Sequence, residues 1–232
     1  MAVAGIADED IHVVLRESQG PVVVAVADGG AVRGLRRAGG GRLAALAQAG
    51  TVSSVRRVAI IGAECVGKTE LARHLADALP GLWIPEYLRE FCDRLRRTPQ
   101  PQEQAHILAE QRRREDEALL RAAALGFEWV LADSAPLVTA VYSELLFDDL
   151  SLHGQAMVHH ARYEATLLLV PDLPWIADGI QRDGPAVREA CHALLLQRLQ
   201  QAGLPFALVG GTGDQRRQAA SSALRPIIDT ER

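Results

Sequence analysis

The sequence predicts an α/β fold in which helices cover both faces of a mostly five-stranded parallel sheet, giving three layers. From Val58 onward, short apolar runs typical of strands alternate with longer stretches typical of helices, and this alternation favours βαβ units. The first apolar run leads directly into a glycine-containing turn and then an amphipathic stretch. With 232 residues, 48% of them hydrophobic, the chain can bury one sizeable core.

Each element is predicted from its own pattern of apolar residues and its flanking turn residues. The expected strands of the parallel sheet are residues 58–61, 82–85, 129–132, 165–170 and 206–209. The expected helices are residues 68–79, 86–96, 102–125, 135–147, 152–161, 185–202 and 214–224.

Composition divides the chain near residue 57. Residues 1–56 are predicted to form an appendage of unknown role, partly mobile, and residues 57–232 the main domain. Within the appendage, residues 11–15 and 22–27 resemble strands, the Asp28-Gly29-Gly30 segment predicts a turn, and residues 42–49 predict a short helix.

Charge and cysteine content exclude several classes of partner. The net charge of -4 gives no surplus of cations for a nucleic acid or an anionic membrane, so a small-molecule substrate is expected. Three widely spaced cysteines predict neither a disulfide framework nor a paired-cysteine metal site. No apolar run approaches the roughly 20 residues of a membrane span, and no secretory signal is recognised, so we expect a cytoplasmic protein. The oligomeric state is not predicted.

Residues 62–69 carry the strongest motif in the chain. The run Gly62-Ala63-Glu64-Cys65-Val66-Gly67-Lys68-Thr69 matches G-x-x-x-x-G-K-S/T in full, after an apolar strand and before a helix, as the P-loop requires. Its backbone N–H groups are expected to cradle the phosphates of ATP. Lys68, the single lysine of the chain, is expected to reach the β and γ phosphates, and Thr69 to bind Mg²⁺. An ordinary strand-to-helix turn is the alternative.

Two acids follow strands of the predicted sheet. Asp133 ends the strand at 129–132, where a carboxylate can hold Mg²⁺ directly or through water; the alternative is a helix N-cap. Glu86 follows the strand at 82–85 and is expected to accept the proton of the acceptor hydroxyl or to hold its ribose. A first-turn helix acid is the alternative for Glu86. Which of the two is the general base stays open.

Basic residues are needed to neutralise the phosphoryl group during transfer. Arg182 lies in the polar segment 178–183, where a mobile lid can close over phosphates, and is a catalytic candidate. Arg188 is a weaker one, with a solvated helix face as its alternative. Arg89 is expected to support the acceptor pocket.

Aromatic and glycine residues offer further contacts. Trp175 and Tyr87 can stack on a flat ring of the acceptor, and core packing is the alternative for both. Gly211, in the glycine-rich loop at 210–213, is expected to let the backbone approach the adenine, with a plain turn as the alternative.

Several segments together resemble a known family. The phosphate loop, residues 85–90, residues 133–140 and the Pro-Trp-Ile-Ala-Asp-Gly run that begins at residue 174 and continues to Arg182 are similar to the nicotinamide riboside kinase domain of NadR-type proteins. The resemblance spans about residues 57–225. It implies a P-loop nucleoside- or nucleotide-kinase-like fold and transfer of phosphate from ATP to the ribose 5′-hydroxyl, giving nicotinamide mononucleotide in NAD salvage. It also implies a set of residues around the riboside: Glu86, Tyr87, Arg89, Trp175 and Asp178, with Trp175 or Tyr87 near the nicotinamide.

The chain departs from that family at two points. Ala135 stands where the family often carries a second acid, so any role of that acid is missing. The adenylyltransferase part of bifunctional members does not fit into 56 residues, which predicts a kinase-only relative. Two alternative functions stay open. One is a kinase for another nucleoside or small metabolite, and the other is a nucleotide-binding regulator.

Overall fold

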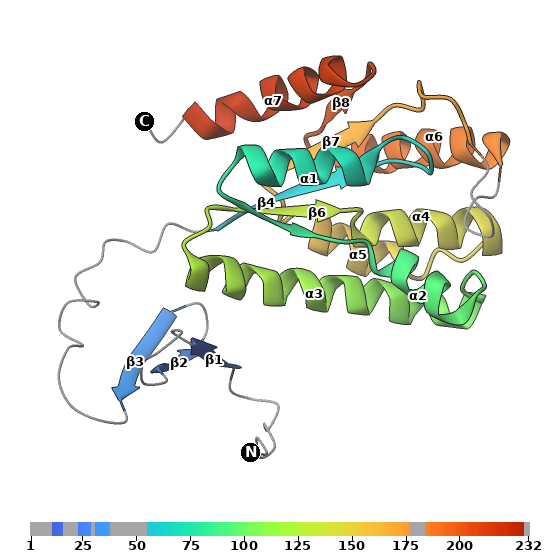
Figure 1. Ribbon diagram of the computed structural model, residues 1–232. Helices are drawn as coiled ribbons and strands as arrows, with labels where there is room; N and C mark the ends of the chain where they lie inside the picture. The colour runs from blue at the N-terminus through green and yellow to red at the C-terminus, as the bar shows by residue number, and fades with distance from the viewer. Residues whose placement is uncertain (1–10, 16–22, 29–30, 38–54, 177–183, 230–232) are drawn as a thin grey trace. The chain divides into compact units, whose positions relative to one another are not determined.

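The computed structural model describes residues 11–15, 23–28, 31–37, 55–176 and 184–229, and the chain divides into two compact units, Met1–Ser53 and Ser54–Arg232 (Figure 1). The first unit contains an antiparallel sheet in the order β1-β2-β3, formed by β1 (Ile11–Leu15), β2 (Val23–Asp28) and β3 (Ala31–Arg37). The first two strands were predicted, β3 was not, and the predicted helix at 42–49 lies outside the described residues.

The second unit is built on a five-stranded parallel sheet in the order β5-β6-β4-β7-β8. Its strands are β4 (Arg56–Ile61), β5 (Gly81–Ile84), β6 (Trp129–Asp133), β7 (Ala165–Leu169) and β8 (Ala207–Val209). Central strand β4 is buried along its whole length, as expected when both faces of a parallel sheet are covered.

Seven α-helices and one short 3₁₀-helix, η1 (Pro101–Glu103), accompany this sheet in the described part of the second unit. The helices are α1 (Lys68–Ala78), α2 (Tyr87–Leu95), α3 (Gln104–Leu125), α4 (Pro136–Phe147), α5 (His153–His160), α6 (Pro185–Gln201) and α7 (Asp214–Asp229). None of the helices described is long and apolar enough to cross a bilayer.

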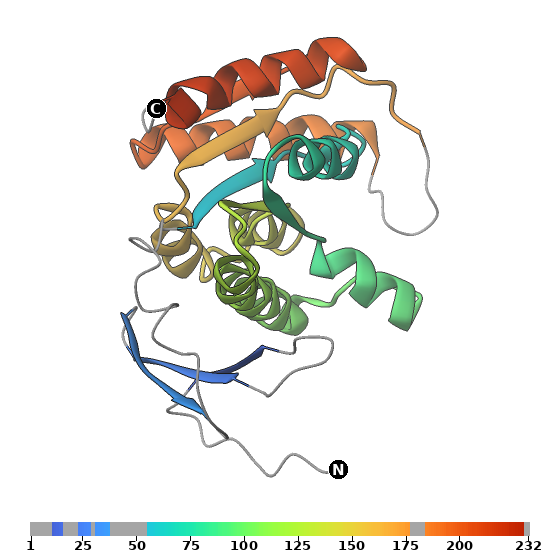
Figure 2. The same ribbon diagram turned by 60° about the vertical axis from the view of Figure 1, so that its left-hand side comes forward.

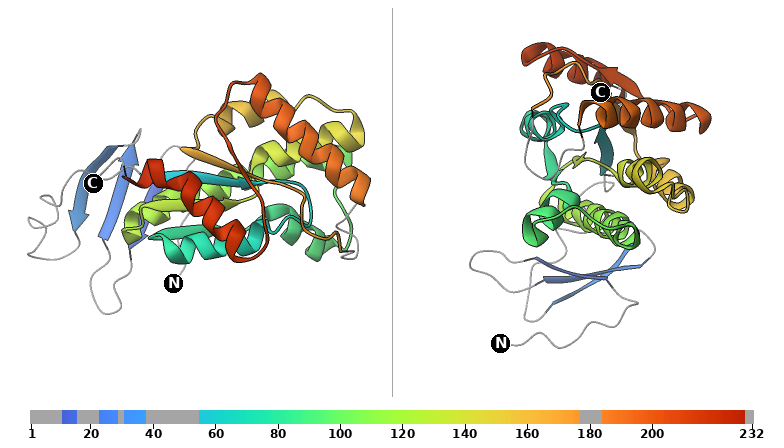
Figure 3. Two further views of the ribbon diagram at one scale, coloured as in Figure 1. Left: turned by 90° about the horizontal axis from the view of Figure 1, so that it is seen from above. Right: turned by 90° about the vertical axis from the view of Figure 1, so that its right-hand side faces the viewer.

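The helices form a layer on each face of the sheet (Figures 2 and 3). Val58 and Ile60 of β4 pack with α1 and α7, whereas Ala59 and Ile61 pack with α4 and α6. On that second face α3 packs on Val130 of β6. Alternate side chains of one strand thus enter two separate cores, which confirms the predicted three-layer α/β fold.

Parallel strands bring their carboxyl ends to one edge of the sheet. The loops after β4, β5, β6, β7 and β8 therefore all begin at that edge, the usual place for a ligand in an open α/β sheet.

Candidate functional site

A cavity of about 290 Å³ lies at this edge. One wall is the segment Glu64–Thr69, which leads from β4 into α1. A second wall comes from α2 and the residue before it, including Glu86 and Arg89, and a third comes from α4. Segments that are distant in the sequence thus surround one space.

The loop after β4 is curled by backbone conformations that glycine permits. Gly62 has φ +151°, and a Cβ placed there would lie 2.9 Å from Cγ2 of Val66 and 3.1 Å from the carbonyl oxygen of Leu169. Gly67 has φ +78° and caps the N-terminus of α1, which begins at Lys68. The positive end of α1 therefore points at the cavity, as in anion sites at helix N-termini.

The ammonium group of Lys68 lies within this loop. Its Nζ donates hydrogen bonds to the carbonyl oxygens of Gly62 at 3.1 Å and Ala63 at 2.8 Å, and Lys68 lines the cavity. A compact ammonium group can keep such contacts and still reach a phosphate oxygen, because it carries three donors that rotate about the end of a flexible stem.

Asp133 and Thr69 meet beside the loop. Asp133 is the last residue of β6 and is only 2% exposed, and Thr69 lies near its carboxylate. Burial, and then the negative charge of Glu86, raise the pKa of the Asp133 carboxyl above its usual range. Its Oδ1 is buried and has no hydrogen-bond partner among the described residues. The N-cap of the following helix is Ala135, so Asp133 is not the cap that the alternative required.

Glu86 and Arg89 both line the cavity. Glu86 is the N-cap residue of α2, with extended backbone (φ −64°, ψ 120°) and no side-chain cap hydrogen bond. It is therefore not a first-turn helix acid, and its carboxylate is not used to cap the helix that follows.

Tyr87 is not on the cavity wall, although it was predicted to contact the acceptor. It is 3% exposed, its hydroxyl lies 3.0 Å from Nε2 of His106, and the Arg114 guanidinium lies 4.5 Å from its ring centroid. Helix α2 turns this ring toward α3, so Tyr87 packs in the core and the structure gives no support to stacking on an acceptor.

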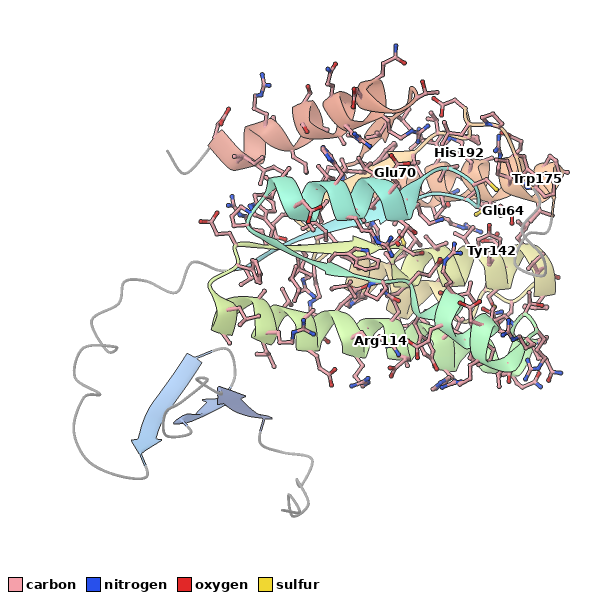
Figure 4. The ribbon with its side chains drawn as sticks, in the orientation of Figure 1. Glu64, Glu70, Arg114, Tyr142, Trp175 and His192 are labelled. Carbon is pink, nitrogen blue, oxygen red and sulfur yellow. The ribbon has the colours of Figure 1, made fainter. Side chains whose placement is uncertain are left out.

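Trp175 is half-buried, and its indole is hydrogen-bonded to the phosphate loop. Its indole Nε1–H donates to Oε1 of Glu64 at 2.9 Å, and the same oxygen accepts a hydrogen bond from the backbone N–H of Gly184 at 3.2 Å. Figure 4 shows Glu64 and Trp175 close together at one end of the second unit. The two other predicted residues of this region, Asp178 and Arg182, lie outside the described residues.

Arg188 and Gly211 are placed away from the cavity lining. Arg188 is buried and donates to the carbonyl oxygens of Leu173 at 2.8 Å and Pro171 at 2.5 Å, so it fastens the chain after β7 instead of presenting a solvated cation. Gly211 has φ +87°, and its N–H donates to Oδ2 of Asp172 at 2.6 Å. Approach of Gly211 to an adenine stays a prediction.

The wall formed by α4 was not predicted from the sequence. Val138, Tyr142, Leu146 and Phe147 line the cavity there, and they make that side of the cavity largely apolar. Burial raises the pKa of the Tyr142 phenol. The helix is apolar on most sides, so its sequence periodicity did not mark one face as a binding surface.

Comparisons with known proteins find a matching family model and similar solved structures. A family model described as an AAA domain matches residues 57–216. A crystal structure of NadR protein in complex with NR is similar with a TM-score of 0.63 and 21% identity, over 75% of this chain and 50% of that chain. A second, of NadR protein in complex with NAD and AMP-PNP, gives 0.61 and 19%, over 75% and 49%.

The chain thus spans about half the length of these two solved structures. No curated protein matches the sequence. The similarity agrees with the resemblance noted from the motifs and shows a shared P-loop α/β fold.

Proposed function

The chain belongs to the AAA-domain family whose model spans residues 57–216, and from this premise we propose that it is a kinase that uses ATP and Mg²⁺ to phosphorylate a nucleoside. The proposed acceptor is the ribose 5′-hydroxyl of nicotinamide riboside, and the product is nicotinamide mononucleotide. One observation carries the proposal: a single cavity joins the phosphate loop with Glu86, Arg89 and an apolar wall.

The phosphate side of the reaction falls to the loop. Backbone N–H groups at the start of α1 hold the β and γ phosphates, and Lys68 compensates the charge on the phosphoryl group as it moves. The acceptor oxygen forms a bond to the γ phosphorus, the bond from that phosphorus to the β–γ bridging oxygen breaks, and ADP leaves. Arg182 remains our predicted lid cation.

Glu86 is the proposed general base. It lines the cavity and is free of a capping role, so it can take the proton of the attacking hydroxyl. Asp133 is less suited, because it is only 2% exposed. Because positioning and charge compensation dominate phosphoryl transfer, the base makes the smaller contribution.

The residues present fit a magnesium ion. Thr69 offers a hydroxyl, and Asp133 offers a buried carboxylate oxygen without a partner in the described part of the chain; oxygen ligands of this kind suit Mg²⁺, which also keeps waters and phosphate oxygens. When bound, the ion neutralises negative charge on the nucleotide phosphates. No cluster of three or more His, Cys, Asp or Glu able to hold a metal occurs in the described ranges.

The acceptor side rests on shape, chemistry and similarity. Leu88, Val138 and Phe147 give an apolar surface for a flat base, while Glu86 and Arg89 offer polar groups for a ribose. One similar solved structure is of NadR protein in complex with NR, which supports nicotinamide riboside as the acceptor to test first. Asp178 and Trp175 remain predicted contacts.

A coupled assay of ADP release tests the proposal. ADP release by the purified protein with Mg-ATP is measured with nicotinamide riboside, with each nucleoside of a common panel, and without an acceptor. Release stimulated mainly by nicotinamide riboside, with mononucleotide identified by mass, is the expected result. Stimulation by another nucleoside would keep the kinase and discard this acceptor. Tight ATP binding without stimulation by any acceptor would favour a nucleotide-dependent regulator.

A further inference from the structure

Arg216 is a buried cation that ties three loops together behind the phosphate loop. It lies in the first turns of α7 and is 5% exposed. Its Nη1 donates to the carbonyl oxygen of Val66 at 2.8 Å, its Nε donates to the carbonyl oxygen of Gly211 at 2.8 Å, and its Nη2 pairs with Oδ1 of Asp172. The loops after β4, β7 and β8 thus meet at one guanidinium group.

The hydrogen bond to Val66 acts on the peptide that joins Val66 to Gly67. A trans peptide is planar, and its carbonyl oxygen and its N–H point to opposite sides. Because Arg216 holds the oxygen, the orientation of the Gly67 N–H is set as well, and Gly67 lies on the cavity wall. Gly67 has the left-handed conformation, φ +78°, and as a glycine it carries no side chain that could set the direction of this peptide.

Asp172 stabilises the buried guanidinium group of Arg216. Its carboxylate neutralises the guanidinium charge and, through Oδ2, accepts the N–H of Gly211 at 2.6 Å. Gly210 allows the close approach, since a Cβ there would lie 3.0 Å from Oδ2 of Asp172. A buried guanidinium whose three nitrogens each meet an acceptor is tolerated, and its planar fork fixes three partners at once.

We propose that Arg216, supported by Asp172, is a positioning residue for the nucleotide: it presets the phosphate-loop peptide whose N–H faces the phosphates. The inference rests on the proposed use of the loop for ATP, and it does not depend on which acceptor is phosphorylated. It assigns a binding function to a side chain that never lines the cavity.

Calorimetric titration of the full chain with ATP and with ADP, without acceptor, tests this. Arg216→Gln is expected to weaken binding of both nucleotides by about tenfold to a hundredfold, the effect of losing one charged hydrogen bond. Arg216→Lys keeps the positive charge but loses the planar guanidinium group. Its nucleotide affinity is expected to lie between those of Arg216→Gln and the parent. Arg225→Gln is the matched control, because Arg225 is exposed on the same helix; its affinity should match the parent's.

One kinetic measurement and two fallback variants separate positioning from simple stability. At saturating ATP the KM for the acceptor should stay within about twofold of the parent value, since the hydrogen bonds of Arg216 reach Val66, Gly211 and Asp172 and none of the proposed acceptor residues. Unchanged nucleotide affinity in Arg216→Gln, whatever its melting temperature, would overturn the proposal.

If Arg216→Gln does not fold, Arg216→Lys and Asp172→Asn decide: parental affinity in both contradicts the proposal, and weakened affinity in both supports it. A parent that binds ATP and phosphorylates nothing would refute the kinase proposal and leave this one testable.

Discussion

Lys68 is the residue on which the proposed chemistry most depends. Its Nζ already lies within hydrogen-bond distance of two loop carbonyls, of Gly62 and Ala63. Lys68→Ala is expected to lower kcat by about 10²–10³-fold, because a preorganised charge that stabilises the transition state is removed. The melting temperature should change little, since no core packing is lost. Arg73→Ala is the control, an exposed cation on the same helix; parental turnover in Lys68→Ala would contradict the mechanism.

Asp133 connects function to pH-dependent stability. Because its pKa is raised in the folded protein, the folded state binds a proton more tightly than the unfolded state does. Folding is therefore favoured at low pH, and this contribution is lost as the pH rises past the ordinary aspartate pKa of 3.8 and through the raised folded value.

Asp133→Asn removes this buried charge. We expect a melting temperature above the parent's at pH 8, by about 2–4 °C if the gain is ~1 kcal/mol, with a smaller difference at pH 4.5. Activity should fall sharply, with a raised Mg²⁺ requirement. Thermal scans at both pH values and a magnesium titration measure this; a variant less stable than the parent at pH 8 would show that Asp133 supports the fold rather than straining it.

Some residues of the site could be predicted and others could not, for a physical reason. The P-loop motif is local, because eight consecutive residues specify the turn and the helix start, so Lys68 and Thr69 could be assigned from sequence. The contact of Glu64 with Trp175 and that of Arg216 with Val66 join residues 111 and 150 positions apart. Such contacts depend on loops meeting at the sheet edge, and no sequence pattern specifies them.

Among the elements, helix α3 contributes to a buried chain of hydrogen-bonded polar side chains. Glu115 is fully buried and accepts hydrogen bonds from the Gln111 side chain at 3.2 Å and from the Tyr163 hydroxyl at 2.5 Å. Its Oε2 also lies 2.7 Å from Nε2 of His159. Gln111 in turn accepts the N–H of Tyr87 at 2.9 Å. The chain thus links α5 to the start of α2, next to the cavity.

Glu115→Leu is expected to destabilise the protein by about 3 kcal/mol or more, because it leaves buried donors without acceptors. The corresponding fall in melting temperature is about 6–12 °C. Glu115→Gln should cost less, since an amide oxygen still accepts. Glu117→Leu on the same helix is the control, because that side chain is 60% exposed. Equal melting temperatures for the two leucine variants would show that the buried chain adds no stability.

Strand β3 shows why one element was not predicted. Its residues, Ala31–Arg37, include three arginines and a glycine, which lack the alternating apolar pattern of a half-buried strand. Pairing with β2 through antiparallel hydrogen bonds forms this strand, and backbone pairing leaves no trace in composition. The strands of the parallel sheet were predictable because each contains at least three consecutive apolar residues.

At the scale of the molecule, the order of the parallel strands was beyond the sequence. The pattern of apolar runs predicted five strands and their helices, but the order β5-β6-β4-β7-β8 depends on which faces the connecting helices cover. That order places β4 at the centre, between β6 and β7, so the phosphate loop lies between Asp133 at the end of β6 and the loop that carries Asp172.

The division into two compact units yields the last prediction. Residues 54–232 contain the whole parallel sheet, both helix layers and the cavity. A chain of these residues alone is therefore expected to fold cooperatively, to bind ATP within about twofold of the full chain's affinity, and to keep its acceptor preference. Calorimetric titration, thermal scans and the ADP-release assay on both forms measure this. Parental ATP binding with loss of acceptor turnover would instead give residues 1–53 a part in acceptor binding, and loss of folding would make the first unit a structural requirement of the second.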